Sequence, residues 1–276
     1  MIFLLFRRTS HPLSSGLIAG LMCLSLTAIA QITDHPSGQL DPILLDKSAL
    51  SGLGLERIHL RNEPDRDFFE RVLYRGESLS VYIISSQSWT GSMENFFIDE
   101  YVHIFHGKSR ARPVDGKDLF FQTGDHFSIP KGFTGEWEVM AGDNYHYELS
   151  VFTTHRVPTP KLSLMQSPLL FDKDKLSGLE IRWGDDEEGL YEDIMFKGDE
   201  LTIFLRAEKA RSMELIQPAK EQLISVLSGQ LTLQSTTGEA HTFFSGDIFI
   251  IPKGMTGSWT SQGHSLLKYL AIEKTD

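Results

Sequence analysis

The stretch that decides the fold is GDHFSIPKGFTG, residues 124–135, because the chain repeats it as GDIFIIPKGMTG at residues 246–257. Nine of the twelve positions are identical, and the second copy lies 122 residues after the first. In each copy a Gly-Asp turn, a short strand and a Pro-Lys-Gly turn follow one another. Two polar residues of the first copy, His126 and Ser128, become Ile248 and Ile250 in the second.

The 122-residue offset extends well beyond this motif. It pairs several further identical residues: Gly76 with Gly198, Gly107 with Gly229, Trp137 with Trp259, and Tyr147 with Tyr269. Two copies with so long a period predict two whole domains and not a solenoid, whose units are shorter and more numerous.

Each copy is predicted to be all-β. The segments ESLSVYII (77–84) and DELTIFLR (199–206) alternate polar and apolar residues, as half-buried strands do. Further short strands follow between Gly, Asp and Pro turns, ending in HYELSVF (146–152) and LLKYLAI (266–272). Many short strands separated by such turns indicate a sandwich or a barrel.

Residues 1–30 are predicted to be a secretory signal peptide. Arg7 and Arg8 precede the apolar run GLIAGLMCLSLTAIA, which is too short for a membrane span and ends in the cleavage pattern Ala28-Ile29-Ala30. We therefore expect a mature protein that begins at Gln31 and is periplasmic or secreted.

The amino-acid composition limits the kinds of site and partner that the mature chain can have. Cys23 is the only cysteine, so cleavage would leave no thiolate for a metal site or a nucleophile. Loss of residues 1–30 removes two arginines and no acid, which changes the net charge from −11 to −13. This charge disfavours nucleic acid and anionic membranes as partners.

The predicted organisation is an N-terminal barrel at 31–155, a Pro-rich linker at 156–168 and a C-terminal barrel at 169–276.

The order of strands and glycine turns resembles the cupin barrel, a double-stranded β-helix of the jelly-roll type. The motif GD-x4-PKG-x-TG-x-W, present in both copies, resembles more narrowly the cupin branch that includes (S)-ureidoglycine aminohydrolase and ethanolamine-utilisation cupins. The resemblance implies an all-β fold with two cupin barrels in tandem. Cupins often pair barrels edge to edge, so a homodimer stays open. The fold hosts many activities, so it implies no particular reaction.

The resemblance also allows a test for metal. Metal-binding cupins carry His-x-His, a Glu separated by six residues from a glycine, and a His after the Pro-x-Gly turn. Here Glu100 matches the Glu, but residues 93–96 read MENF and Gly135 takes the place of the last His. The second copy has Gln222 and Gly257 at the two matching positions. We therefore expect little or no tightly bound metal and no other cofactor, since such a site needs several converging ligands. A divalent metal in the first barrel stays open, because that copy keeps a carboxylate and imidazoles.

The first copy keeps a polar excess over the second. It has His103, His106, His126 and His146, where the 122-residue offset places Ser225, Ser228, Ile248 and Lys268. Strand alternation puts Val102 and Ile104 on the face of Glu100 and His103 on the other. We expect His103 and His106 at the surface.

The predicted ligand-binding residues are Glu100, His126 and His146, around one polar cavity. The leading hypothesis is an exported cupin that binds a small polar molecule in its N-terminal barrel, while a filled C-terminal barrel is structural. Two alternatives stay open. One is a metal-dependent, aminohydrolase-like enzyme acting on a small nitrogenous or carbonyl compound, and the other is an interaction scaffold that binds no ligand.

Overall fold

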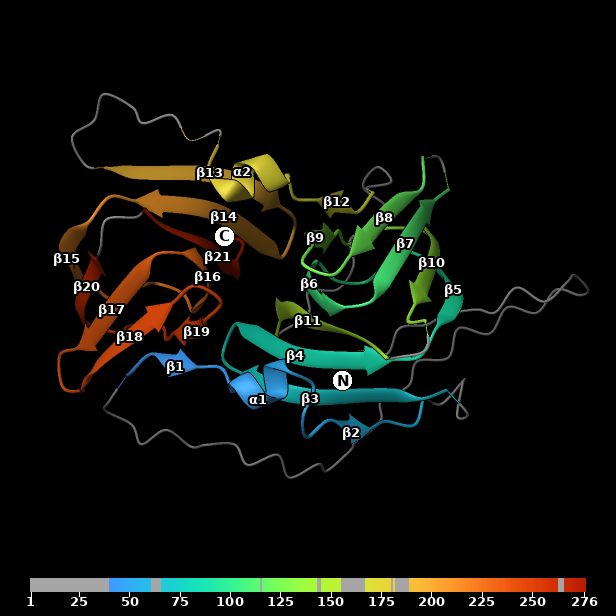
Figure 1. Cartoon of the computed structure of the whole chain (residues 1–276), viewed down its shortest axis with the longest axis horizontal. Coiled ribbons are helices and arrows are strands. Elements are labelled where there is room, and N and C mark those ends of the chain that lie inside the picture. The colour runs from blue at the N-terminus through green and yellow to red at the C-terminus, as the bar shows by residue number, and fades with distance from the viewer. Residues whose placement is uncertain are drawn as a thin grey trace, which may run out of the picture.

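The computed structural model describes residues 40–60, 66–114, 116–142, 145–154, 167–179, 181, 189–262 and 266–276. The predicted signal peptide and residues 156–166 of the predicted linker lie outside the described residues. The described part forms two β-barrels side by side, as predicted (Figure 1).

The N-terminal barrel is built from two antiparallel sheets. The larger sheet has seven strands, in the order β12 (Leu169–Leu170), β9 (His126–Ile129), β6 (Glu100–His106), β11 (His146–Thr153), β4 (Leu79–Ser86), β3 (Phe68–Arg75) and β2 (Glu56–Arg57). The smaller sheet has the order β5 (Trp89–Met93), β10 (Gly135–Met140), β7 (Lys108–Pro113) and β8 (Leu119–Gln122).

The C-terminal barrel repeats this arrangement. Its larger sheet has six strands, in the order β1 (Ile43–Leu44), β19 (Ile248–Ile251), β16 (Gln222–Ser228), β21 (Leu267–Lys274), β14 (Leu201–Glu208) and β13 (Leu190–Lys197). Its smaller sheet has the order β15 (Arg211–Leu215), β20 (Gly257–Gln262), β17 (Gln230–Ser235) and β18 (Ala240–Phe244). Gly107 and Gly229 occupy equivalent turns with positive φ, after β6 and β16 respectively.

Three apolar clusters hold the molecule together. One lies inside the N-terminal barrel and includes Val102 and Trp137, and a second lies inside the C-terminal barrel and includes Trp259. The third joins the outer faces of the two larger sheets, with Val81 from one barrel and Ile203 from the other. Every residue of β4 is therefore buried, although its alternation predicted a half-buried strand. The second face of this sheet is covered by the other barrel and not by water.

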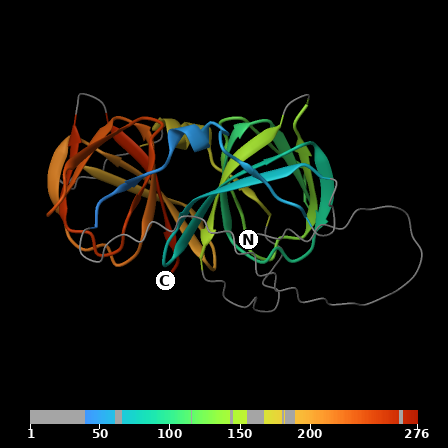
Figure 2. The same ribbon diagram turned by 90° about the horizontal axis from the view of Figure 1, so that it is seen from below.

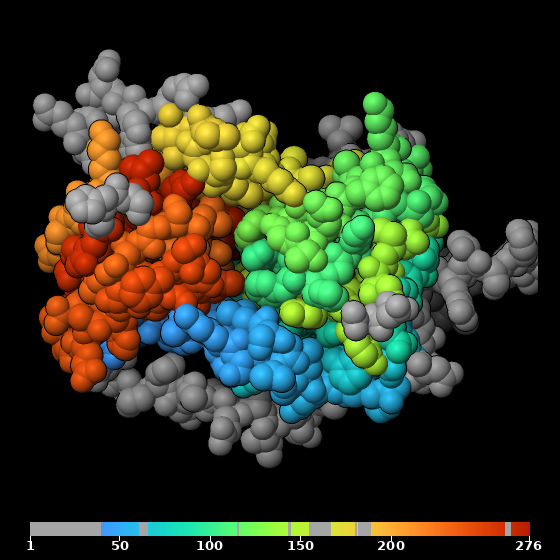
Figure 3. All heavy atoms as spheres, in the orientation of Figure 1, coloured from blue at the N-terminus to red at the C-terminus, as the bar shows by residue number. Residues whose placement is uncertain are grey.

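Short segments are exchanged between the two barrels. Strand β1 pairs with β19 of the C-terminal barrel, and β12 pairs with β9 of the N-terminal barrel. The exchanged segments read ILLDKSALSGL (43–53) and LLFDKDKLSGL (169–179), a second repeat with an offset of 126 residues. Figures 2 and 3 show the N-terminal segment, in blue, lying across the junction between the barrels.

Each exchanged strand leads into a one-turn helix, α1 (Lys47–Leu50) or α2 (Lys173–Ser177), that begins after an aspartate cap. The first lysine of each helix pairs with the Asp of a Gly-Asp turn. Lys47 lies 2.6 Å from Asp247, and Lys173 lies 2.7 Å from Asp125. The repeated motif therefore anchors the exchanged segments.

Two carboxylates cross the junction in equivalent positions. Asp99 accepts hydrogen bonds from the backbone N–H groups of Glu200 (2.6 Å) and Lys131 (2.8 Å). Glu221, 122 residues later, accepts from the N–H groups of Glu77 and Ser78, both at 2.8 Å. Each carboxylate thus satisfies turn donors of the opposite barrel.

The turns that receive these carboxylates contain the repeated glycines Gly76 and Gly198. A Cβ on Gly198 would lie 2.2 Å from Asp99 Oδ2, and a Cβ on Gly76 would lie 2.3 Å from Glu221 Oε1. A larger residue at either glycine would have to displace the carboxylate of the other barrel, which backbone hydrogen bonds hold in place.

A lysine–glutamate pair also occurs twice at the junction, but in different surroundings. Lys131 Nζ lies 2.7 Å from Glu200 Oε1, with both side chains at most 3% exposed. Lys253 Nζ lies 2.9 Å from Glu77 Oε1, with side chains that are 50% and 67% exposed. No helix within the described residues has the length and apolar character needed to cross a membrane.

Candidate functional site

The strand register places Glu100 inside the N-terminal barrel. Glu100 pairs with Ile129 at the start of β6, and its same-face neighbours Val102 and Ile104 belong to the interior core. The prediction that these three residues share a face is confirmed. Glu100 is 5% exposed, and the Ser150 hydroxyl donates a hydrogen bond to its Oε1.

The surroundings of Glu100 favour the protonated acid. Burial removes water from the carboxylate and raises the pKa of Glu100 to about 8; Ser150 opposes this rise, and the nearby Glu148 adds to it. At neutral pH, Glu100 is therefore mainly a neutral carboxylic acid that can both donate and accept a hydrogen bond.

His146 lies on the same interior face. Strand β11 alternates, so His146, Glu148 and Ser150 point into the barrel together with Phe152 of its core. His146 Nε2 lies 2.8 Å from Glu148 Oε2, and the His146 side chain is 2% exposed. An ionised Glu148 can only accept, so Nε2 then carries the proton.

The other ring nitrogen of His146 faces the turn after β6. Its buried Nδ1 has no hydrogen-bond partner among the described residues. A Cβ on Gly107 would lie 2.7 Å from this nitrogen, so the glycine leaves room for the imidazole. The interior site therefore combines a neutral acid at Glu100 with an imidazole–carboxylate pair.

The register corrects the pairing of the last strands. His146 pairs with Ser86, while Leu267 pairs with Glu208, the residue 122 after Ser86. The last strand is thus offset by 121 residues, and the predicted pairing of His146 with Lys268 is wrong. The predicted pairing of Tyr147 with Tyr269 fails for the same reason, because the second copy is one residue shorter before this strand.

With the corrected offset, the two interiors differ strongly. The equivalents of His146, Glu148 and Ser150 are Leu267, Tyr269 and Ala271, which all belong to the C-terminal core. Glu148 and Ser150 were not among the predicted site residues. Alternation from His146 along HYELSVF would have found both.

The C-terminal barrel also buries a carboxylate, Glu208, but satisfies it within the core. Glu208 accepts hydrogen bonds from Tyr269 Oη (2.8 Å), Trp259 Nε1 (2.9 Å) and Arg211 Nε (3.2 Å). Gln222, the equivalent of Glu100, donates to Glu273 at 2.7 Å. These side chains bond to one another, as expected of a filled barrel.

His126 lies on the opposite sheet face from Glu100, so the expectation that the two share one cavity is wrong. His126 pairs with His103, and Ser128 pairs with Tyr101, a residue of the cluster between the barrels. Their counterparts Ile248 and Ile250 belong to that same cluster and do not fill the C-terminal barrel. The His-to-Ile difference is a feature of the junction, because side chains alternate strictly along β9.

His103 and His126 form a stacked pair at this junction, although His103 was expected at the surface. Their ring centroids lie 3.9 Å apart, and the Tyr101 hydroxyl lies 2.7 Å from His126 Nδ1. Burial lowers the pKa of His126 to about 4, and burial together with the neighbouring His126 lowers the pKa of His103 to about 3. Both imidazoles are neutral at physiological pH.

The residues around Glu100 do not fit the usual cupin metal set. Met93 and Phe96, from the stretch that aligns with His-x-His, are buried in the apolar core. A Cβ on Gly135 would lie 2.4 Å from the Arg112 carbonyl oxygen, so no histidine fits there. The described residues contain no group of three or more His, Cys, Asp or Glu that could hold a metal ion.

Comparison with solved structures gives the same fold. A cupin 2 conserved barrel domain protein from Leptotrichia buccalis has a TM-score of 0.55 at 10% identity, covering 87% of this chain and 99% of its own. A DUF861-family protein of unknown function from Pseudomonas syringae pv. tomato has a TM-score of 0.60 at 15% identity, with coverages of 85% and 100%. The Lactobacillus farciminis oxalate decarboxylase formate complex has a TM-score of 0.51 at 14% identity and 88% coverage of both chains.

At these identities the likeness concerns the fold alone. A comparison with functionally curated proteins found no match. The family model of the EutQ-like cupin domain matches two stretches, residues 76–147 and 212–269, one in each barrel. Each barrel thus carries a match to the EutQ-like cupin domain, and the fold is that of two cupin barrels in tandem.

Proposed function

We propose that this cupin binds a small polar molecule inside its N-terminal barrel and that the C-terminal barrel is structural. The observation that carries the proposal is the difference between equivalent interiors. Glu100, His146, Glu148 and Ser150 stand where the other barrel has Gln222, Leu267, Tyr269 and Ala271.

The free energy that it costs to bury these polar side chains supports a binding function for the N-terminal interior. A buried carboxyl group with a raised pKa is expensive to keep, and a purely structural core could use apolar residues there. Glu100 can donate a hydrogen bond to a carbonyl or hydroxyl oxygen of the ligand and accept one from its N–H or O–H. The ligand class that fits is therefore a small uncharged compound such as an amide or a polyol.

An enzymatic alternative rests on the pairing of a protonated carboxylic acid with an imidazole–carboxylate pair. A neutral carboxylic acid and an imidazole in one site are groups that can serve general acid–base chemistry. The sequence resemblance to the ureidoglycine aminohydrolase branch would suggest a small nitrogenous substrate. Because the usual metal ligands do not fit, no metal-dependent step is assigned.

We also propose that residues 1–30 are removed and that the protein acts outside the cytoplasm. The basic start, the apolar run and the Ala28-Ile29-Ala30 pattern support this proposal. Intact-mass measurement on protein from the native host would show a chain that begins at Gln31; a chain that retains Met1 would refute it.

Thermal-shift measurement with a panel of small amides and polyols tests the ligand proposal. At least one compound is expected to raise the melting temperature of the unmodified protein, to lose this effect in Glu100→Gln, and to keep it in Gln222→Ala. Gln222 is the matched control because it occupies the equivalent position in the other barrel. Equal loss in both variants, or no shift with any compound, contradicts the proposal and favours the scaffold.

A further inference from the structure

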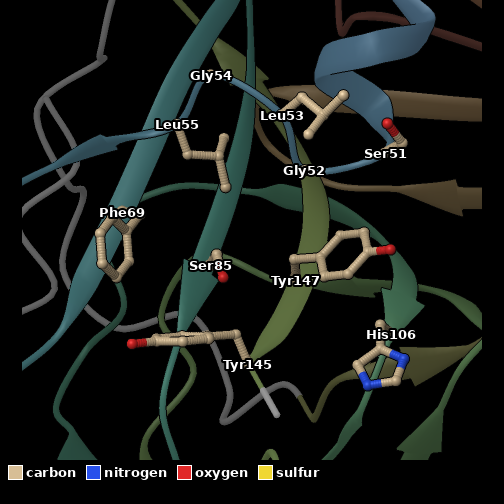
Figure 4. Close-up of a pocket in the computed structure, with 10 residues that line it drawn as sticks. All are labelled: Ser51, Gly52, Leu53, Gly54, Leu55, Phe69, Ser85, His106, Tyr145 and Tyr147. Atoms are coloured by element: carbon tan, nitrogen blue, oxygen red, sulfur yellow. The ribbon is translucent and has the colours of Figure 1, made fainter.

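A surface groove lies on the outer face of the N-terminal barrel, away from the interior site. It has a volume of about 580 Å³ and lies between the loop 51–55 and the larger sheet. Figure 4 shows Ser85 near the centre of the lining residues, with Phe69, Tyr145 and Tyr147 around it. The volume falls in the range of sites for small molecules.

The same place in the C-terminal half is identified by strand register. Tyr147 pairs with Ser85 and His106, while Lys268 pairs with Ala207 and Ser228, the residues 122 later. Both sheets have a bulge at the same point, so the assignment of Tyr147 to Lys268 is unambiguous. The loops also correspond, since Ser51-Gly52-Leu53 and Ser177-Gly178-Leu179 are identical.

In the C-terminal half this place is occupied by the chain itself. Lys268 Nζ donates a hydrogen bond to the Ser177 carbonyl at the end of α2. Its methylene chain lies over Gly178, where a Cβ would be 3.0 Å from Lys268 Cδ. The ammonium thus lies at a helix C-terminus, where the backbone dipole favours positive charge.

In the N-terminal half the matching glycine faces open space. Gly52 and Gly178 have nearly the same backbone conformation, with φ of 86° and 87°. A Cβ on Gly52 would meet no atom within 4 Å. The groove is therefore the space that Lys268 fills in the other half, left open because Tyr147 replaces the lysine.

We propose that this groove binds a primary alkylammonium compound, a free counterpart of the Lys268 side chain. Three aromatic rings line the groove, and such rings attract an ammonium group through their π faces. None of the described residues that line it is Lys, Arg, Asp or Glu. Arg71 donates a hydrogen bond to the Leu53 carbonyl at the edge of the groove, but its charge is paired with Asp46 at 3.0 Å. The net charge of −11 further favours the approach of a cation.

The test is titration of the full chain with n-butylammonium chloride, followed by ligand-observed NMR, with 1-butanol as the uncharged comparison. Butylammonium is expected to bind, and to bind at least three-fold more tightly than butanol. Absence of butylammonium binding overturns the proposal. Equal binding of butanol, or tighter binding of a neutral sugar such as methyl glucoside, also overturns it.

Variants locate the site. Tyr147→Lys places in the N-terminal groove the residue that fills the C-terminal one, and should weaken binding at least ten-fold. Tyr145→Ala removes a partly exposed ring and should weaken binding about two- to five-fold, the range of an exposed cation–π contact. Tyr145→Ala keeps the test decisive if Tyr147→Lys does not fold. Glu100→Gln, in the interior site, should leave butylammonium binding unchanged. Unchanged binding in Tyr145→Ala or Tyr147→Lys places the cation elsewhere and overturns the proposal.

Discussion

Replacement of Glu100 by glutamine should make the protein more stable, and increasingly so as the pH rises. Burial raises the pKa of Glu100 from 4.5 to about 8. Between these values the folded state holds a proton that the unfolded state releases, so each increase in pH favours unfolding. Below about pH 4.5 the carboxyl is protonated in both states and the effect vanishes.

The size of the effect follows from the pKa shift. A rise of about 3.5 units at about 1.4 kcal/mol per unit corresponds to about 5 kcal/mol of lost stability above pH 8. Glutamine has no proton to lose, and its carbonyl can still accept from Ser150. The free energy of unfolding of Glu100→Gln should therefore gain about 4 kcal/mol on the unmodified protein between pH 5 and pH 9.

Urea denaturation at pH 5, 7 and 9 measures this difference. The two proteins share all other titrating groups, so the contributions of these groups to the difference in unfolding free energy largely cancel. Glu148 is the neighbour whose charge interacts with Glu100. Gln222→Ala, which changes a group that does not titrate, serves as the control with a constant difference. A difference between Glu100→Gln and the unmodified protein that stays within about 1 kcal/mol over this pH range would refute the reasoning.

Three further predictions concern the junction. Lys131→Met should lower the free energy of unfolding by about 3–5 kcal/mol because it leaves a buried carboxylate unpaired, whereas Lys253→Met should change it by less than about 1 kcal/mol; similar values from urea denaturation would contradict the burial contrast. Gly198→Ala should be destabilising, but less so in an Asp99→Ala background that frees the space, and additive effects in a double-mutant cycle would exclude the steric conflict. Because the pKa of His103 is lowered, stability should fall as the pH drops from about 6.5 towards 3, and His103→Ser should reduce this fall in acid denaturation.

The repeat predicted two like domains, because a repeated motif at a fixed offset carries its strands and turns with it. The prediction that each domain is a barrel came from the resemblance to cupins. Alternation from Glu100 also placed Val102 and Ile104 correctly. Both predictions rest on local patterns that neighbouring residues reinforce.

The remaining errors came from tertiary arrangement. His126 was assigned to the interior because one sequence does not show which face of a strand the other barrel covers. His146 was paired with Lys268 because a single-residue difference between the copies shifts the offset from 122 to 121. Such a shift inverts the face assigned to every side chain in the last strand.

The exchanged segments set the order in which the chain can be completed during synthesis. Ile43, near the start, pairs with Ile250, which leaves the ribosome 207 residues later. Strand β1 can therefore pair with β19 only after the C-terminal barrel has been synthesised, whereas β12 pairs with β9, which is synthesised before it. Contacts this distant in sequence slow folding, because a long loop must close before they form. The two barrels are consequently joined by two exchanged strands, one near the N-terminus and one in the middle of the chain, and neither barrel can open fully without releasing a strand of the other.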